Sequence, residues 1–174
     1  MEIRDATDDD ASAIRQVHEA SIRGLGPEAY DDRQVEAWAT GCASADYAAS
    51  IDEDGNEFVV AEDDGTILGF GSLSHDASGY PIEVDAEVTA VYVAPSVARN
   101  GVGTAILDEV ETRARARGAE RLVLTASKNA VSFYQRHGYV RHRSIQHEFS
   151  PGASTGVTGT VVEMVKPLSV QRAN

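Results

Sequence analysis

The feature that most constrains this fold is an apolar run that ends at a proline and leads through a glycine-containing loop into a helix. The run covers residues 91–94 and ends at Pro95, and the loop that follows contains Arg99, Gly101 and Gly103. Such a turn directs several backbone N–H groups outward at a helix N-terminus, where a phosphate can bind. Glycine lets an anion approach the backbone because no Cβ intervenes. The stretch therefore predicts a site for a phosphate-bearing cofactor.

Length and composition indicate one globular domain spanning residues 1–174, with 42% hydrophobic residues. No apolar run approaches the roughly 20 residues needed to cross a bilayer, and the charged start at residues 1–5 lacks a signal-peptide core. We therefore expect a cytoplasmic protein without a membrane partner. A single cysteine, Cys42, excludes an internal disulfide and a cysteine-based cluster. The five histidines are dispersed, so no metal site is expected.

The formal net charge of −13 is unusual for a chain of this length. It argues against nucleic acid as a partner, because binding to a phosphate backbone requires a basic surface. Two explanations for the acidity remain open. One is a cationic substrate, and the other is adaptation to a salt-rich, halophilic cytoplasm with an acidic proteome. The scatter of the acidic residues through turns and helix faces favours the second explanation.

Hydrophobic periodicity predicts a mixed α/β domain built around one sheet. The expected strands are residues 2–6, 57–62, 66–74, 82–93, 121–126, 139–149 and 160–166. One helix is expected to end near residue 22. Four further helices are expected over residues 30–40, 43–51, 102–117 and 127–137. A loop rich in glycine, serine and threonine is expected to join the last two strands.

Two familiar phosphate-binding loops do not fit this order of elements. A P-loop requires a lysine directly after its second glycine, and none follows Gly101 or Gly103. A dinucleotide-binding fold places its glycine-rich turn after the first strand of a βαβ unit. Here the glycines come past the middle of the chain, after a pair of strands with the pattern of an antiparallel hairpin.

The loop matches a third kind of site. The segment from Ala98 to Gly103 resembles the pyrophosphate motif [QR]-x-x-G-x-[GA] of the GNAT superfamily of acetyl-CoA-dependent N-acetyltransferases. It departs from the motif at Ala98, and Arg99, one residue later, is the candidate to supply the missing charge. The backbone cradle does not depend on that side chain, since it is formed by Gly101, Gly103 and the start of the helix.

A second segment strengthens the resemblance. Many members carry the pattern S-x-x-A-x-x-F-Y-x-x-x-G-[FY], and this chain matches it from Ser127 to Tyr139. The two motifs occur in the family's order with one strand between them, and the resemblance covers nearly the whole chain. It implies a mostly antiparallel sheet of about seven strands, flanked by helices, in which strands four and five splay apart. Many members form homodimers, which makes a dimer one expectation.

The resemblance also implies how acetyl-CoA is bound. The pantetheine arm fills the gap between strands four and five like an added strand and bonds to backbone groups of Val91 and Val93. The pyrophosphate binds to amides from Arg99 to Thr104. Asn129 is a candidate contact to the CoA arm, although solvation of a helix N-terminus explains it equally well. The expected cofactor-binding residues are Val91, Tyr92, Val93, Arg99, Asn100, Gly101, Val102, Gly103, Thr104 and Asn129.

The implied reaction moves an acetyl group directly from the thioester to a primary amine of a small molecule or a protein. Such an amine is mostly protonated at neutral pH, so a base must remove a proton. Glu87 lies fourteen residues before Gly101, and this position matches the general-base glutamate in the histone-acetylating branch of the family. Alternation along the expected strand places Glu83 and Asp85 on the same face as Glu87, where they could relay the proton through water.

The remaining catalytic roles follow from the same resemblance. Tyr134 is the candidate acid for the departing thiolate, because the family places this tyrosine near the CoA sulfur, whereas Phe133 is expected in the core. The backbone N–H of Val93 is the candidate oxyanion donor. Tyr30 and Trp38 fall where members build one wall of the acceptor pocket, although core packing explains Trp38 equally well.

Two other classes of function remain as alternatives. A non-catalytic acyl-CoA-binding or regulatory module on the same fold would bind CoA without turnover. The presence of both Glu87 and Tyr134 argues against it. A nucleotide-binding domain would bind ATP or NAD and not CoA.

Overall fold

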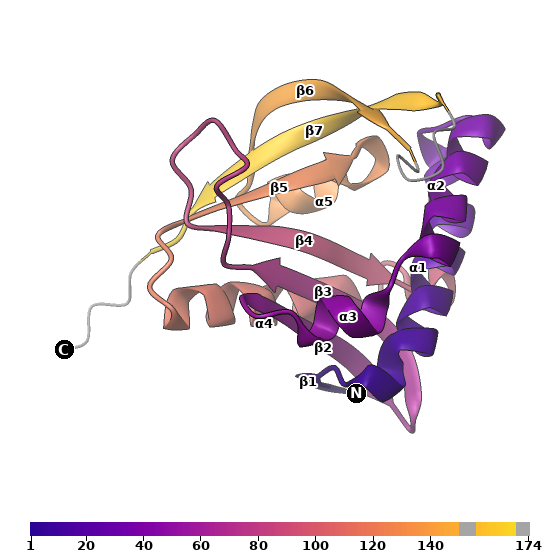
Figure 1. The fold of residues 1–174 in the computed structure, drawn as a ribbon, viewed down its shortest axis with the longest axis horizontal. Coiled ribbons are helices and arrows are strands. Elements are labelled where there is room, and N and C mark those ends of the chain that lie inside the picture. Colours follow the sequence, from indigo (N-terminus) through magenta and orange to yellow (C-terminus); the bar gives the residue numbers. More distant parts are fainter. Residues whose placement is uncertain (150–155, 170–174) are drawn as a thin grey trace.

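The computed structural model describes residues 1–149 and 156–169 as one mixed α/β fold around a seven-stranded sheet (Figure 1). The order of the strands in the sheet is β1-β2-β3-β4-β5-β7-β6. All neighbours are antiparallel except β4 and β5, which run parallel. The strands are β1 (Glu2–Asp5), β2 (Asn56–Asp63), β3 (Thr66–Ser74), β4 (Ala86–Val93), β5 (Arg121–Ser127), β6 (Val140–Glu148) and β7 (Thr158–Pro167).

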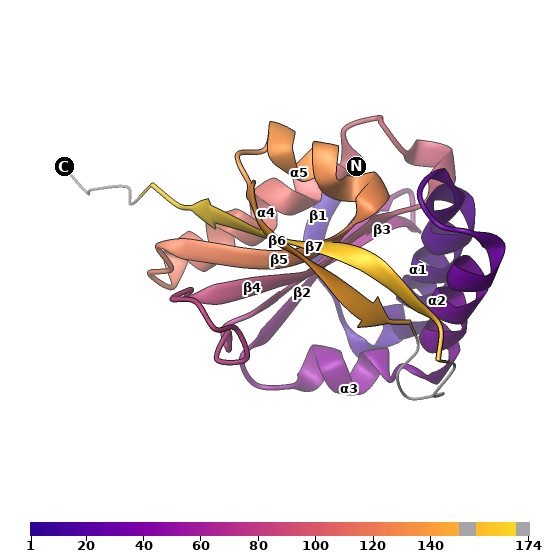
Figure 2. The ribbon, with the colours of Figure 1, turned by 90° about the horizontal axis from the view of Figure 1, so that it is seen from above.

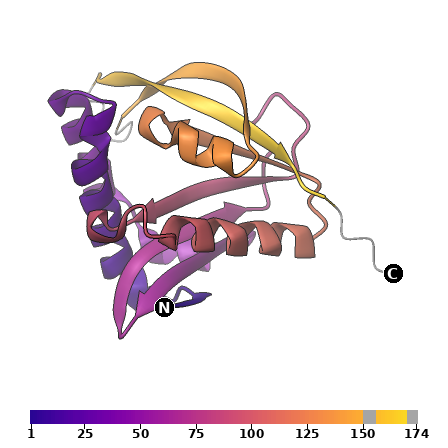
Figure 3. The same cartoon turned by 180° about the vertical axis from the view of Figure 1, so that it is seen from behind.

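Helices cover both faces of the sheet and one of its ends. Figure 2 shows α4 and α5 on one face and α3 on the other, and Figure 3 shows α4 and α5 from behind. Helices α1 and α2 stand across the end of the sheet toward which β4 runs. The helices are α1 (Ala11–Leu25), α2 (Asp32–Ser44), α3 (Tyr47–Asp52), α4 (Val102–Ala116) and α5 (Val131–Arg136). No helix in the described part of the chain is long and apolar enough to cross a membrane.

Glycines in β3 let α4 pack unusually close to the sheet. A Cβ added at Gly71 would lie 2.5 Å from Cγ2 of Ile106, and one added at Gly69 would lie 2.8 Å from Cδ1 of the same side chain. Ile106 is fully buried in the main core beside Val110. This close approach places the N-terminus of α4 beside the end of β4, where the sequence motif predicts the cofactor.

The pairing of β4 with β5 is very short. Only Ala86 and Glu87 of β4 are in register with β5, opposite Leu122 and Val123. Beyond Glu87 the two strands diverge, and Figure 1 shows them separating toward α1. One edge of β4 therefore lacks a neighbouring strand over most of its length.

The orientation of that free edge follows from the other side of β4. The amide of Ala94 donates to the carbonyl of Leu68 on β3. Because hydrogen bonding alternates along an antiparallel strand, Val91 and Val93 turn their N–H and C=O groups away from β3. A register shift opposite Thr89, which hydrogen-bonds to the hydroxyl of Ser72, sets this alternation. The gap is thus lined by backbone groups that are free to bond.

The sequence-based prediction of one mixed sheet with parting central strands is confirmed, but several boundaries were wrong by a few residues. The strand predicted at 82–93 begins only at Ala86. The apolar side chains at 82 and 84 belong to the preceding loop and pack against β5 and β7, so their alternation is not that of a strand. The helix predicted at 127–137 starts with a 3-10 turn, Lys128–Ala130, and α2 continues to Ser44. The predicted loop between the last two strands falls largely outside the described residues.

We predict that Gly71→Ala lowers the free energy of unfolding by about 1–3 kcal/mol, because the new methyl group forces Ile106 and α4 away from the sheet. Urea denaturation measures this change. Gly79→Ala is the matched control, since a Cβ there meets no atom within 4 Å. Equal stability of the two variants would contradict the close packing of α4 on β3.

Candidate active site

A groove of about 770 Å³ occupies the gap between β4 and the start of α5. Its walls come from the end of α1, the second half of β4, the N-terminus of α4 and the first turns after β5. Eight of the ten residues predicted to bind the cofactor line it. They are Val91, Tyr92, Val93, Arg99, Gly101, Gly103, Thr104 and Asn129. The other two, Asn100 and Val102, are exposed to solvent and buried in the core, respectively.

The N-terminus of α4 presents unpaired amides to this groove. Gly101 has a φ of +86°, a left-handed conformation that lets the chain turn into the helix. Its carbonyl accepts the first helical hydrogen bond from Ala105, which leaves the preceding N–H groups without helical acceptors. The partial positive charge of a helix N-terminus adds to this donor set. The turn therefore has the backbone geometry that favours an anion.

The predicted cradle needs one correction at the backbone of Asn100. Its amide donates to the carbonyl of Val97 at 3.3 Å inside the preceding turn. The run of free donors from Arg99 to Thr104 is thus interrupted at this residue. The reason is the 3-10 turn Pro95–Val97, which continues as a tight turn into the loop.

Gly103 keeps the floor of the groove open. A Cβ added there would lie 3.5 Å from Cζ of Phe133 and 3.7 Å from Cγ1 of Val93, which are ordinary contacts. Packing within the protein therefore does not require a glycine at this position. A side chain at position 103 would instead occupy the space between α4 and α5.

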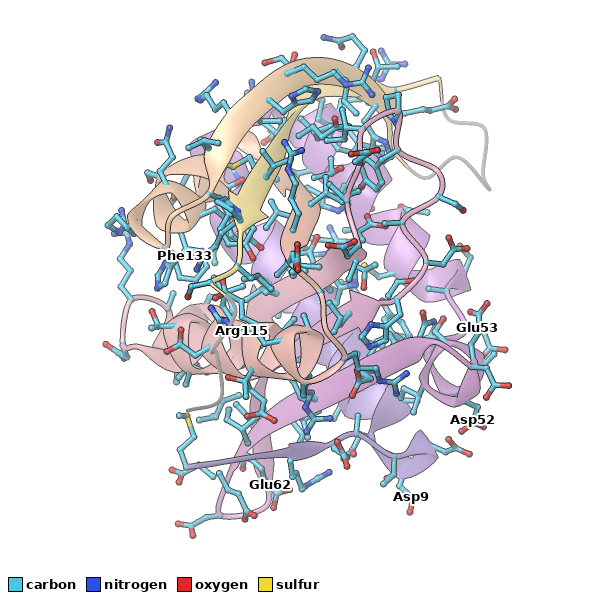
Figure 4. The ribbon with its side chains drawn as sticks, turned by 90° about the vertical axis from the view of Figure 1, so that its left-hand side faces the viewer. Asp9, Asp52, Glu53, Glu62, Arg115 and Phe133 are labelled. Atoms are coloured by element: carbon cyan, nitrogen blue, oxygen red, sulfur yellow. The ribbon has the colours of Figure 1, made fainter. Side chains whose placement is uncertain are left out.

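The core position predicted for Phe133 is confirmed only in part. Its half-buried side chain packs against the main core and also lines the groove. Figure 4 shows its side chain on α5, on the side toward α4. The short helix α5 turns Phe133 toward Gly103 and its neighbour Tyr134 inward.

Asn129 carries an unsatisfied acceptor at the groove wall. Its Oδ1 is buried and has no hydrogen-bonding partner among the described residues. Leaving such an atom unpaired costs about 1–3 kcal/mol, which a ligand N–H could recover. This observation favours contact with a bound ligand over simple solvation of a helix N-terminus. An amide-bearing arm lying along the free edge of β4 has the right chemistry.

Arg99 connects the glycine loop to the end of α1. Its guanidinium lies 3.1 Å from a carboxylate oxygen of Glu28, and 83% of its side chain is exposed. An exposed pair of this kind contributes little to stability. Gly24 on α1 lets the segment before the loop pack closely against this helix, because a Cβ there would lie 2.6 Å from the Pro95 side chain. The loop is thus braced against α1 while Arg99 remains accessible.

Glu87 is the last residue of β4 that pairs with β5, so it stands where the strands part. Tyr80 donates a hydrogen bond of 2.7 Å to its Oε1. Burial raises the pKa of the Glu87 carboxyl, the hydrogen bond from Tyr80 opposes that rise, and the nearby charge of Glu163 adds to it. A half-buried carboxyl with a raised pKa is a candidate general base, and Glu87 lies where the strands part without itself lining the groove.

The predicted face of three carboxylates requires a correction. Glu83 and Asp85 precede β4 rather than belonging to it, and both are exposed. One oxygen of Asp85 accepts hydrogen bonds of 2.9 Å from the amides of Glu120 and Arg121. The Asp85 carboxylate therefore holds the start of β5 in place. The two residues do not share a strand face with Glu87.

Tyr134 is buried within the main core rather than exposed in the groove. Its ring centroid lies 5.1 Å from that of Phe133 and 5.6 Å from that of Tyr139. Burial raises the pKa of its phenol, which therefore stays protonated and able to donate near neutral pH. Its catalytic role stays a prediction.

The aromatic residues expected in an acceptor pocket do lie together. Trp38 lines the groove and stacks on Phe149 at 5.6 Å, and its ring lies 5.7 Å from Tyr30. The hydroxyl of Tyr30 bridges two segments, donating to the carbonyl of Thr160 and accepting from the amide of Lys128. Tyr30 is therefore occupied in joining elements, whereas Trp38 has a side exposed to the groove.

No group of three His, Cys, Asp or Glu residues within 1–149 and 156–169 is arranged to hold a metal ion.

The fold thus brings a parted strand pair and a helix N-terminus together at one groove. A family model described as an acetyltransferase (GNAT) domain matches residues 27–150, more than half of the chain. The chain belongs to the GNAT acetyltransferase family.

The individual relatives described next share less than a third of their aligned residues with this chain. The chain is 28% identical over 141 residues to an uncharacterized N-acetyltransferase of Methanocaldococcus jannaschii. That match covers 79% of this chain but only 59% of the length of the relative. A crystal structure of a GCN5-related N-acetyltransferase (Aminotransferase, Class-II) from Rhodopseudomonas palustris is 28% identical with a TM-score of 0.80, covering 96% of this chain and 95% of the other.

A further solved structure resembles the fold at lower identity. The PaiA N-acetyltransferase of Thermoplasma acidophilum, solved in complex with coenzyme A, has a TM-score of 0.74 at 21% identity. The match covers 96% of this chain and 98% of that one.

Two residues at the site, Tyr80 and His137, were not predicted from the sequence. Tyr80 lies in a loop without a motif, and only the folded chain brings its hydroxyl to Glu87. His137 lies inside the second motif but was not singled out. It lines the groove, where its Nε2 lies 3.1 Å from Oγ1 of Thr104. The helical spacing of His137 from Phe133 was the available signal.

We predict that Gly103→Glu abolishes stabilisation by acetyl-CoA, because the carboxylate fills the groove floor and repels a phosphate. Thermal denaturation with and without acetyl-CoA measures this, since a ligand at 100-fold its Kd adds about 2.7 kcal/mol of stability. Gly79→Glu adds the same charge at an exposed loop position and is expected to keep the shift. An unchanged shift in the Gly103 variant would place the cofactor elsewhere.

Proposed function

We propose that residues 1–174 form a single domain that transfers an acetyl group from acetyl-CoA directly to a primary amine of a small molecule or a protein. The observation that carries this proposal is the free edge of β4 facing a groove that ends at the unpaired amides of α4. A chain that has to accommodate an extended, amide-bearing cofactor with a diphosphate requires both features. The buried, unpartnered oxygen of Asn129 supports the same occupant.

Binding is assigned to backbone groups rather than to charged side chains. The free groups of Val91 and Val93 bond to the pantetheine amides as a strand would. The amides of Gly101 to Thr104 hold the diphosphate at the positive end of α4. Acetyl-CoA supplies a thioester, an activated acyl group, to this site. The net charge of −13 does not prevent binding, because salt screens the long-range repulsion and short-range donors act at the groove itself.

Deprotonation of the acceptor is assigned to Glu87. An amine with a pKa of about 10.4 is neutral in only about one molecule in a few thousand at pH 7, a handicap of roughly 4–5 kcal/mol. The Glu87 carboxylate lies at the start of the gap, four residues before Val91, or roughly 13 Å along an extended strand. This separation favours removal of the proton through water. The backbone N–H of Val93 is the donor assigned to the developing oxyanion.

Release of the thiolate is assigned to Tyr134. Its phenol remains protonated in the core, and a phenol can donate a proton or a strong hydrogen bond to a thiolate. Trp38 is assigned to the acceptor side of the groove, where its ring provides an apolar wall.

A panel of amines assayed with acetyl-CoA and thiol detection tests the proposal as a whole. Transfer to any primary amine supports it, and the preferred amine identifies the acceptor class. Stabilisation by acetyl-CoA without thiol release from any amine would favour the non-catalytic binding module. Stabilisation by ATP or NAD and not by CoA would contradict the proposal.

We predict that Glu87→Gln lowers kcat/KM by about 100-fold or more at pH 6 and by less at pH 9, since a general base contributes about 100- to 10,000-fold. The loss shrinks at high pH because more of the amine is neutral without assistance. Steady-state kinetics across this range measure it, with acetyl-CoA binding checked by thermal shift. Glu120→Gln, which alters an exposed carboxylate outside the site, is the control. Full activity at pH 6 would remove Glu87 from the mechanism.

We predict that Tyr134→Phe lowers kcat about tenfold or more while leaving the KM for the acceptor nearly unchanged, because the phenol acts on the leaving group. The control is Tyr139→Phe, which removes a hydroxyl from the neighbouring buried aromatic ring and is expected to leave kcat unchanged. An unchanged kcat in the Tyr134 variant would leave it a core residue only.

A further inference from the structure

The loop of residues 75–85 between β3 and β4 is packed onto the sheet and carries one tyrosine toward β4. Figure 1 shows this loop passing over β5 and β7 on the face opposite α4 and α5. Ala77 is buried against Val123 of β5 and Val165 of β7, and Tyr80, Ile82 and Val84 pack on the same cluster. The amide of Tyr80 also donates to the carbonyl of Ala77 at 3.2 Å. The ring of Tyr80 is thus held in one place.

The hydroxyl of Tyr80 joins two strands at the point where they part. It donates to Oε1 of Glu87 on β4 at 2.7 Å. The same oxygen lies 3.2 Å from Oγ1 of Thr125 on β5. Since the phenol proton is directed to the carboxylate, Thr125 donates to the phenol oxygen. Such a chain of donors strengthens each hydrogen bond in it.

The charged groups around Glu87 make this donor important. Glu163 on β7 is buried and faces the same cluster, and its charge raises the pKa of the Glu87 carboxyl, as burial does. Glu163 is itself paired with Arg143 on β6, at 3.2 and 3.3 Å, and lies 3.9 Å from Nε2 of His142. Within the described residues, Tyr80 is the only side chain that donates a hydrogen bond to Glu87.

We propose that Tyr80 is a positioning residue that fixes the orientation of the Glu87 carboxylate and stabilises its ionised form. A carboxylate that accepts a hydrogen bond favours the charged state, whereas burial and a neighbouring carboxylate favour the neutral acid. A base has to be ionised to take a proton, so Tyr80 extends the working range of Glu87 toward lower pH. The Thr125 hydroxyl holds the Tyr80 oxygen in line for this contact.

The inference rests on the proposed function only in treating Glu87 as the base. The hydrogen bond from Tyr80 to Glu87 can be tested in the free protein, without acetyl-CoA or an acceptor. NMR titration of carbon-13-labelled glutamate carboxyls measures this directly, with the Glu87 signal assigned by its absence in Glu87→Gln.

We predict that Tyr80→Phe moves the titration midpoint of Glu87 to higher pH, because the ring stays and only the donor is lost. Thr125→Val is expected to shift it in the same direction by a smaller amount. The matched control is Tyr47→Phe, which deletes a buried phenol hydroxyl bonded to His18 and remote from this cluster. The control is expected to leave the Glu87 midpoint in place. An unshifted midpoint in folded Tyr80→Phe, or an equal shift in the control, would overturn the inference.

Kinetics with the amine found by the panel provide the second readout. In Tyr80→Phe the acid limb of the kcat/KM profile is expected to move to higher pH, with activity several-fold below wild type on that limb and close to it on the alkaline plateau. A uniform loss at all pH values would contradict the role of Tyr80 in charge control. If Glu87→Gln keeps full activity while Tyr80→Phe shifts the Glu87 titration, the assignment of the base fails and the positioning contact stands.

Discussion

The parting of β4 from β5 is the constraint on which the rest of this structure depends. The two strands are in register at only two residue pairs, ending at Glu87 and Val123. A strand edge inside a sheet normally finds a neighbour, because buried backbone groups without partners are costly. Here the unpaired edge faces a groove instead, and α4 is packed tightly enough on β3 to bring its N-terminus to the same groove. The opening in the sheet and the anion-binding turn therefore form one continuous site.

The same parting creates two environments on the two faces of the sheet. On the face of α4 and α5, the groove is lined by backbone donors, glycines and the aromatic ring of Phe133. On the opposite face, Glu87 and Glu163 lie among hydroxyls beneath the loop between β3 and β4. The first environment suits a large anionic cofactor, and the second suits proton transfer from a cationic amine. This separation weakens the repulsion between the carboxylates and the diphosphate proposed to bind at α4.

Membership of an acetyltransferase family does not by itself say which residues take part in the reaction. The structure changes the roles predicted for some of them. Asp85 bonds to amides at the start of β5, and Tyr30 ties the segment before α2 to the turn after β5 and to β7. Both residues therefore contribute to the framework of the site. Tyr80, which has no motif around it, is the side chain that bonds directly to the proposed base.

The sequence by itself determined the family, the seven-stranded mixed sheet and the glycine-containing turn that leads into α4. These follow from local signals, since Gly101, Gly103 and the periodicity of α4 act within a few residues of one another. Only the tertiary structure decided that Phe133 faces the groove, that Tyr134 is buried, and that the amide of Asn100 is already bonded. It also decided the partners of Glu87, because Tyr80, Thr125 and Glu163 come from three segments that meet only in the folded chain. Contacts between distant segments depend on strand order and loop packing, which no local pattern encodes.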